Sequence, residues 1–166
     1  MKIRILLILF IAVIFSFNGC KKDEEGNIIV PKMTATVDGA DWKAFLRVST
    51  VQDNKIAISG FPTASKEKAI LITITSTELK TYSVSLLPPK LECGVFYQKT
   101  TGVAVGSSDY FVSFNSTVTL TKYDAEKKLI SGTFSGTLIQ SDQLLTPLSA
   151  TKIEITNGKF ENLSFQ

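Results

Sequence analysis

The sequence predicts an all-β fold, an antiparallel β-sandwich or a small β-barrel of about nine strands. The first observation is an apolar period of two that begins at Met33 and recurs along the rest of the chain. In residues 68–77, Ile70, Ile72 and Ile74 fall on one face, with one leucine and three threonines on the other. The second observation is that turn-forming dipeptides separate such segments at short intervals. No segment after the first twenty residues keeps the apolar stripe of a helix for three turns.

Two later segments repeat the alternation. Val118 and Leu120 alternate with threonines in "STVTLTKY", and Ile153 and Ile155 alternate with charged residues in "TKIEIT". Strands with one apolar and one polar face are typical of antiparallel sheets that have one side in water. The abundant threonine, isoleucine and valine also favour strands.

The turn dipeptides divide the chain into strands. Asp38-Gly39 and Asn157-Gly158 are expected to form two-residue hairpin loops, because both dipeptides tolerate positive φ. Asp53-Asn54 and Asp124-Ala125 are expected to form weaker turns, and Pro88-Pro89 to end a strand.

The strand expected over 109–123 is predicted to bend or break at Asn115. The connection "SDQLLTPLSA" is the one long link, and Pro147 argues against a helix there. The complete set of expected strands covers residues 33–37, 41–51, 55–61, 68–77, 80–87, 94–100, 109–123, 127–140 and 151–165.

The N-terminus has the three parts of a secretory signal. Lys2 and Arg4 form a basic region, Ile5 to Phe15 an apolar region, and Ser16 to Gly19 a small and polar exit. The apolar region is shorter than a membrane-spanning helix requires. The sequence therefore predicts a signal peptide over 1–19, a tether over 20–32 and a single all-β domain over 33–166, with a retained anchor and an ordinary cleaved signal as alternatives.

Cys20 follows Gly19 directly at the end of the apolar region. This arrangement resembles the lipobox of bacterial lipoproteins, although Phe17 and Asn18 stand where most lipoboxes have leucine and a small residue. Looser boxes of this kind are familiar from lipoproteins of the Bacteroidota. The resemblance implies cleavage before Cys20 and attachment of a diacylglycerol with palmitate-type chains to its sulfur, and two or three such chains anchor a protein stably to a membrane.

The charged run after the cysteine, "CKKDEE", is similar to the surface-export signal of Bacteroidota lipoproteins. In that signal a lysine two places after the cysteine precedes two acidic residues, here Lys22, Asp23 and Glu24. The resemblance implies an outer-membrane lipoprotein that faces the cell surface, with the periplasmic face as the alternative. Any charged, solvated linker would have a similar composition.

Three stretches of the remaining chain, "TATVDGADWKA", "KKLISGTFSGTL" and "ITNGKFENLSF", carry a further resemblance. Together they are similar to a family of small Bacteroidota lipoproteins whose domain has no assigned function. The resemblance implies an all-β fold and a tethered location. It supplies no catalytic residues.

Composition excludes several functions. The chain has no histidine, which excludes Ser-His-Asp and Cys-His arrangements and imidazole bases. With Cys20 acylated, Cys93 is the one remaining thiol, too few for a thiolate zinc cage, and we expect it to be a small buried apolar residue. A formal charge of +3 gives no basic footprint for nucleic acid. No cofactor or metal is expected.

Two groups of candidate site residues remain. Asp38 and Asp41 flank a turn beside Trp42 and offer the one close carboxylate pair with an aromatic neighbour, although turn and strand roles explain both aspartates. Trp42, Tyr97 and Tyr110 could offer flat faces to a sugar ring, although such aromatics on alternating strands more often serve core or cross-strand packing. The sequence therefore predicts a membrane-anchored, non-enzymatic binding or structural domain with an unidentified protein or glycan partner; the alternative is a surface lipoprotein that binds or hydrolyses glycans.

Overall fold

The computed structural model describes residues 32–62, 68–86, 89–100, 108–142 and 147–166 and confirms the all-β prediction. In these residues the chain forms eleven β-strands, against about nine expected. Within the same residues there is no helix with the length and hydropathy needed to span a membrane. The signal peptide and the predictions on Cys20, Lys22, Asp23 and Glu24 lie outside the described residues.

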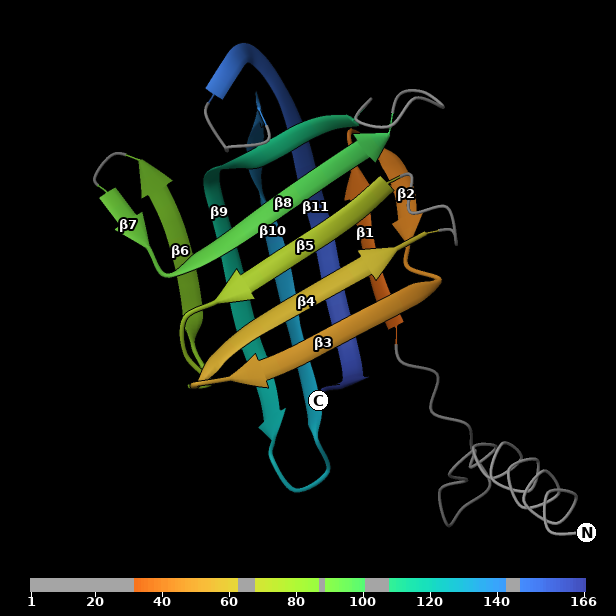
Figure 1. Ribbon diagram of the computed structural model, residues 1–166, viewed down its shortest axis with the longest axis vertical. Helices are drawn as coiled ribbons and strands as arrows, with labels where there is room; N and C mark the ends of the chain where they lie inside the picture. The colour runs from red at the N-terminus through yellow and green to blue at the C-terminus, as the bar shows by residue number, and fades with distance from the viewer. Residues whose placement is uncertain (1–31, 63–67, 87–88, 101–107, 143–146) are drawn as a thin grey trace, which may run out of the picture. The chain divides into compact units, whose positions relative to one another are not determined.

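The strands are labelled in Figure 1. Their bounds are β1 Lys32–Val37, β2 Ala40–Lys43, β3 Leu46–Gln52, β4 Lys55–Phe61, β5 Lys68–Ile74, β6 Thr81–Leu86, β7 Pro89–Leu91, β8 Cys93–Thr100, β9 Ser108–Asp124, β10 Leu129–Ser141 and β11 Pro147–Ser164.

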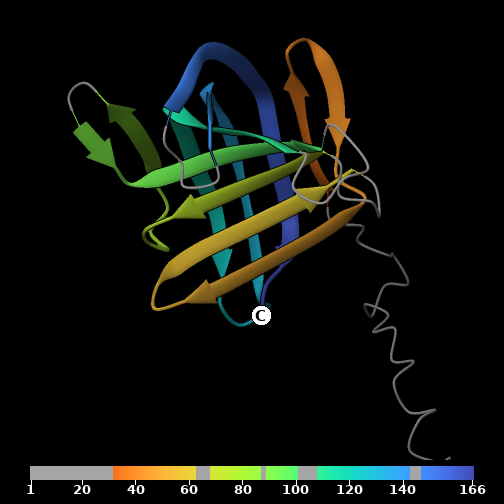
Figure 2. The same ribbon diagram turned by 45° about the horizontal axis from the view of Figure 1, so that its top comes forward.

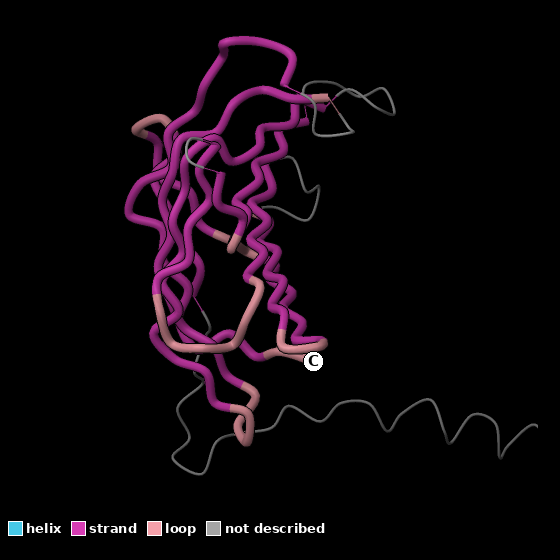
Figure 3. Tube along the Cα trace, turned by 90° about the vertical axis from the view of Figure 1, so that its left-hand side faces the viewer, coloured by secondary structure: helices cyan, strands magenta, loops and turns pink. Residues whose placement is uncertain are grey.

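All eleven strands belong to one antiparallel sheet, which curls into a half-barrel. Its main path runs β2-β1-β11-β10-β9-β8-β5-β4-β3, and β6 and β7 branch from β9. In Figures 1 and 2, strands β3, β4, β5 and β8 cross in front of β9, β10, β11 and β1. The turned view in Figure 3 shows the strands stacked in two layers. The fold thus combines the layered core of a sandwich with the continuous sheet of a barrel.

Strand β9 joins the two layers. One edge of β9 pairs with β8 up to Val112 and with β6 from Asn115 onward, while the other edge pairs with β10 along nearly its whole length. Between these partners, the Ser113 hydroxyl donates to the carbonyl oxygen of Val95 (2.7 Å) and accepts from the Val95 amide (2.6 Å). The bend expected at Asn115 is therefore a change of partner within an unbroken strand.

The edge strand β3 meets the end of β11. The Gln166 amide donates to the Ser49 carbonyl (3.1 Å), and the Val51 amide donates to the Gln166 carbonyl (3.2 Å). The Ser49 hydroxyl also donates to the Ser164 carbonyl (2.6 Å). These bonds satisfy part of an edge that would otherwise be open to pairing with other chains.

The core lies between the two layers, and the alternation predicted it well. Ile70, Ile72 and Ile74 are almost completely buried, as are Val118 and Leu120. The largest fully buried side chains are Tyr82, Phe160, Met33, Ile56, Ile58, Ile70, Ile72, Ile74, Leu120, Ile130, Leu138 and Ile155.

One predicted turn is wrong. Asn157-Gly158 does not form a hairpin, because β11 runs through it without reversing. Asn157 has a φ of 52°, and two residues of β11 stand here opposite one residue of β10, which is a β-bulge. A bulge and a hairpin loop both need positive φ, so the dipeptide alone does not distinguish them.

The other predicted turns are confirmed. Asp38 and Gly39 have φ values of 47° and 79°, and Asp53 and Asn54 have values of 50° and 61°, as two-residue hairpin loops require. Beyond Asp124, whose carboxylate accepts from the Lys127 amide (2.9 Å), the chain turns into β10.

The strand expected over 41–51 is in fact two strands. The chain leaves β2 after Lys43 and enters β3 at Leu46, at the opposite edge of the sheet. Between them the Ala44 amide donates to the Met33 carbonyl and the Phe45 amide to the Phe61 carbonyl. The crossing reverses the phase of alternation, and Leu46, which would share a face with Trp42 in one continuous strand, is 42% exposed.

Two prolines begin strands at positions that the sequence pattern did not predict. Pro89 begins β7, a three-residue strand paired with β6, and Pro147 begins β11 four residues before the expected start at 151. Proline is tolerated at the first position of a strand, where its missing amide leaves the ladder intact. The prolines therefore marked strand starts as well as a strand end.

Candidate functional site

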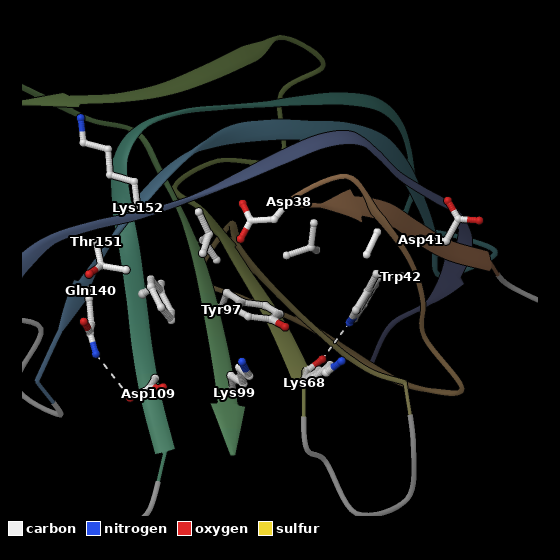
Figure 4. Close-up of a pocket in the computed structure, with 14 residues that line it drawn as sticks. Asp38, Asp41, Trp42, Lys68, Tyr97, Lys99, Asp109, Gln140, Thr151 and Lys152 are labelled. Atoms are coloured by element: carbon white, nitrogen blue, oxygen red, sulfur yellow. Dashed lines mark hydrogen bonds between the residues drawn. The ribbon is translucent and has the colours of Figure 1, made fainter. Parts of the chain in front are cut away.

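A hollow of about 480 Å³ lies between the β1–β2 hairpin and the inner face of the sheet (Figure 4). Its residues come from seven strands and the hairpin turn, so no short motif contains it. The lining residues are Val37, Asp38, Ala40, Asp41, Trp42, Lys68, Tyr97, Lys99, Asp109, Phe111, Gln140, Thr151, Lys152 and Ile153.

The apolar part of the lining consists of three aromatic side chains together with Val37, Ala40 and Ile153. Trp42, Tyr97 and Phe111 are only 4%, 6% and 7% exposed. The indole N–H of Trp42 donates to the Lys68 carbonyl (2.8 Å), which fixes the ring against the start of β5. The rings of Tyr97 and Phe111 lie 6.1 Å apart, tilted by 49°. Packing and the hydrogen bond hold these rings in place, so this part of the hollow is preformed.

The Tyr97 phenol adds a polar group to this apolar part. Burial, together with the nearby carboxylate of Asp38, raises the pKa of Tyr97 above its ordinary value. The phenol is therefore neutral near pH 7 and can donate or accept a hydrogen bond. Within the described part of the chain its oxygen has no hydrogen-bond partner.

The three aspartates of the lining differ in what they contact. One Asp38 carboxylate oxygen accepts from the Glu154 amide (2.7 Å), while the Asp38 amide donates to the Glu154 carbonyl (2.9 Å). These two bonds hold the β1–β2 hairpin against β11. Asp109 accepts from the Gln140 side-chain amide (3.3 Å), and Asp41 is exposed and points away from the hollow in Figure 4.

The three lysines of the lining are all exposed. Lys68 and Lys99 are direct cross-strand partners on β5 and β8. The Lys152 side chain points away from the hollow in Figure 4, and its Nζ atom lies 5.4 Å from the centroid of the Phe114 ring. The charge that faces the hollow from this group is therefore that of Lys68 and Lys99.

The structure brings together two of the three aromatics that the sequence singled out. Trp42 and Tyr97 both line the hollow, whereas Tyr110 points to the opposite face of β9 from Phe111, because successive strand residues alternate. There Tyr110 lines a shallow apolar depression with Leu71. The three aromatics thus do not form one stacking surface.

Packing explains the two other tyrosines. Tyr82 is completely buried, and its hydroxyl donates to the Glu78 carbonyl (2.6 Å). Tyr123 stacks on Phe165, with ring centroids 5.6 Å apart.

The sequence reasoning did not include Lys68, Lys99 and Phe111 among the candidates. A signal for the lysines was present, because Lys68 is in phase with Ile70 and Lys99 is in phase with Tyr97. A lysine in phase with buried residues at a strand end is expected at the rim of the inner face. The matching of Lys68 with Lys99 required the register of two strands that are far apart in sequence.

The groups considered for catalysis are not arranged around one reacting centre. Asp38 contacts the backbone of β11 while Asp41 points outward, and the described residues contain no group of three or more His, Cys, Asp or Glu side chains placed to hold a metal ion. Cys93 is buried as predicted, and burial raises the pKa of its thiol to about 11. A thiol that stays protonated near pH 7 is a poor nucleophile. No protein-family model, no curated protein sequence and no solved structure matches this chain.

Proposed function

We propose that the chain is a lipid-anchored lipoprotein, displayed on the outer membrane at the cell surface, whose β domain binds a small molecule without transforming it. The observation that carries the binding proposal is the hollow. Its volume of about 480 Å³ lies within the range typical of small-molecule sites. Its lining joins an apolar and aromatic wall to polar and charged side chains, which together can hold and orient a ligand.

The rigidity of the wall supports binding further. Trp42 is fixed by its hydrogen bond to the Lys68 carbonyl, and Tyr97 packs against Phe111. A preformed site loses little side-chain entropy when a ligand enters. The hairpin that covers one side is itself held by the bonds between Asp38 and Glu154.

The binding proposal can be tested through Trp42, the one tryptophan in the chain. A ligand in the hollow changes the surroundings of its indole, so titration with panels of soluble oligosaccharides and small aromatic acids should give a saturable change in tryptophan emission. Ala40→Phe places a large ring in the hollow and should abolish the change. Ala57→Phe, at an exposed position of β4 outside the hollow, is the matched control and should preserve it.

An absent response to every compound, or an equal response in the Ala40→Phe variant, would contradict binding in the hollow. A sugar is an alternative ligand to a small aromatic molecule, because Trp42 and Tyr97 both line the hollow. A response to oligosaccharides alone would favour a sugar as the ligand. Trp42 and Tyr97 are only 4% and 6% exposed, so they offer a ligand part of a wall and not an open stacking platform.

The anchor is supported by residues 1–25 of the sequence and is tested separately. Cys20→Ser removes the sulfur that would be acylated, so the variant should not be cut before residue 20 and should not incorporate labelled palmitate. Unchanged palmitate labelling would refute the lipoprotein assignment.

The surface location has its own test. Replacing Lys22, Asp23 and Glu24 by alanine should reduce labelling of intact cells with a membrane-impermeant reagent while palmitate incorporation continues. Undiminished surface labelling would refute the role of these residues in export.

A further inference from the structure

Two lysines face each other at the rim of the hollow. The register of β5 and β8 places Lys68 directly opposite Lys99, and both side chains are exposed. Directly opposed residues in an antiparallel sheet have Cβ atoms roughly 5 Å apart, and like charges in such pairs destabilise the sheet. The register therefore places two like charges side by side at the rim of the hollow.

Ion pairs do not neutralise these lysines in the described part of the chain. The ammonium groups of Lys68 and Lys99 have neither a hydrogen bond nor an ion pair there. The ion pairs within 4.0 Å among the described residues join Lys80 to Glu78, Lys90 to Glu92 and Lys159 to Glu161.

The carboxylates nearest to the hollow have other partners. Asp109 is the cross-strand neighbour of Lys99 on its far side, and its carboxylate accepts from the Gln140 side chain. Asp38 accepts from the backbone of β11. The ammonium group of Lys68 therefore has no described carboxylate in direct contact to compensate its positive charge.

The lysines stand beside the apolar wall. The indole N–H of Trp42 donates a hydrogen bond to the carbonyl of Lys68. Tyr97 lies two residues before Lys99 on the same face of β8. Figure 4 shows Lys68 and Lys99 together below these two rings. An anion held between the ammonium groups would therefore have its body against the indole and phenol rings.

We infer that the hollow binds small organic anions that join a flat apolar body to one acid group, with the body against Trp42 and Tyr97 and the acid between Lys68 and Lys99. This inference rests on the proposed binding function and names the class of ligand. An acid group there relieves the repulsion between the lysines and gains two charge-assisted contacts. The Tyr97 phenol can donate a further hydrogen bond to the same acid.

The test compares two probes with the same body, 2-naphthoate, which is charged, and 2-naphthamide, which is neutral. Binding of each is measured by calorimetry to the full-length lipoprotein in mild detergent, with detergent alone subtracted. We expect 2-naphthoate to bind about tenfold more tightly than 2-naphthamide, as contacts with a charged group typically give. Raising the salt concentration should reduce this preference, because the lysines are exposed.

Three variants locate the preference. Lys68→Gln/Lys99→Gln should weaken 2-naphthoate binding about tenfold and change 2-naphthamide binding by no more than about twofold. Lys68→Arg/Lys99→Arg keeps both charges and should retain the preference. Lys55→Gln/Lys127→Gln removes two exposed lysines outside the hollow and should also retain it, because it changes only the net charge.

The possible results separate this inference from the function on which it rests. Equal affinity for the two probes, with both lost in the Ala40→Phe variant, would overturn the anion assignment and leave the binding function standing. A preference that survives Lys68→Gln/Lys99→Gln would also overturn it. No binding of either probe to the unchanged protein, together with no tryptophan response to the wider panels, would overturn both.

Discussion

Two aromatic regions of the half-barrel are buried to a similar degree but differ in what lies beside their rings. In the first, on β10 and β11, Phe160 packs over Gly132 and Phe134 over Gly158, with the two rings 6.5 Å apart. There is no space left, since a Cβ atom added at Gly132 would lie only 2.5 Å from the Phe160 ring. We call this the filled region.

In the second region, Trp42, Tyr97 and Phe111 border the hollow of about 480 Å³. Their exposed fractions, 4% to 7%, are close to those of the filled region, 3% for Phe134 and 0% for Phe160. Burial alone therefore does not distinguish a packed core from the wall of a site. The distinguishing feature is whether a protein neighbour or open space lies on the other side of the ring.

Truncating one ring in each region should give the largest difference. Phe160→Ala leaves an enclosed cavity and should lower the free energy of unfolding by about 3 to 5 kcal/mol. Phe111→Ala enlarges a hollow that already exists, so a smaller loss of about 1 to 2 kcal/mol is expected. Denaturant unfolding of both variants measures the contrast. Equal losses would mean that the hollow is as tightly packed as the filled region.

Adding one methyl group also tests the contrast between the filled region and the hollow. Gly132→Ala should destabilise by about 2 kcal/mol, because the new Cβ meets the Phe160 ring and the backbone of Thr119. Gly39→Ala, in the hairpin beside the hollow, has no atom within 4 Å of its new Cβ. It has a φ of 79°, however, and should lose about 1 kcal/mol from backbone strain alone.

The thermal unfolding midpoints of the two alanine variants should therefore both fall, with the larger decrease for Gly132→Ala. The reverse order would show that backbone strain outweighs overpacking, and that the filled region can shift to accept a methyl group.

Much of this fold could be predicted from local pattern. The alternation of Ile70, Ile72 and Ile74 predicted a buried face, because strand geometry makes alternate residues share an environment. Asp53-Asn54 predicted a hairpin, because its two residues tolerate positive φ. The prediction failed at Asn157-Gly158, where the same tolerance serves a bulge that lets Phe134 pack over Gly158. That choice depends on a neighbouring strand, which local pattern does not identify.

The hollow was predictable only in part. Trp42 and Tyr97 were singled out as aromatics, but their meeting depends on β2 reaching the start of β5 through the bond to the Lys68 carbonyl. The pairing of Lys68 with Lys99 depends on register between strands about thirty residues apart. The residue types indicated which side chains could contact a ligand. Pairing between strands that are far apart in sequence determined which of these side chains lie in one site.

Ionisation of the Cys93 thiol also tests how well the core excludes water. Burial raises the pKa of the Cys93 thiol from 9.0 to about 11, so the folded protein keeps the thiol neutral where the unfolded chain ionises it. This contribution to stability is fully present below pH 9 and is lost as pH rises from 9 to 11.

The measurement is the stability difference between the unchanged protein and Cys93→Ala, followed by denaturant unfolding from pH 7 to pH 11. The subtraction removes the titration of lysines and tyrosines that both proteins share. The difference should be constant up to about pH 9 and then change in the direction that favours the variant. A constant difference across the whole range would show that the thiol is accessible to water.

The smallest expected effect comes from two serines. The Ser116 hydroxyl is buried without a hydrogen-bond partner among the described residues, and it packs against Gly136. Ser116→Ala removes an unsatisfied polar group and should be neutral or stabilising by up to about 1 kcal/mol. Ser49→Ala breaks the bond to the Ser164 carbonyl and should cost about 1 kcal/mol. The opposite signs follow because only Ser49 has its hydroxyl satisfied, and denaturant midpoints of the two variants measure both. If Ser116→Ala were as destabilising as Ser49→Ala, the Ser116 hydroxyl would have a partner such as a buried water, and space for that water would exist beside the tight contact with Gly136.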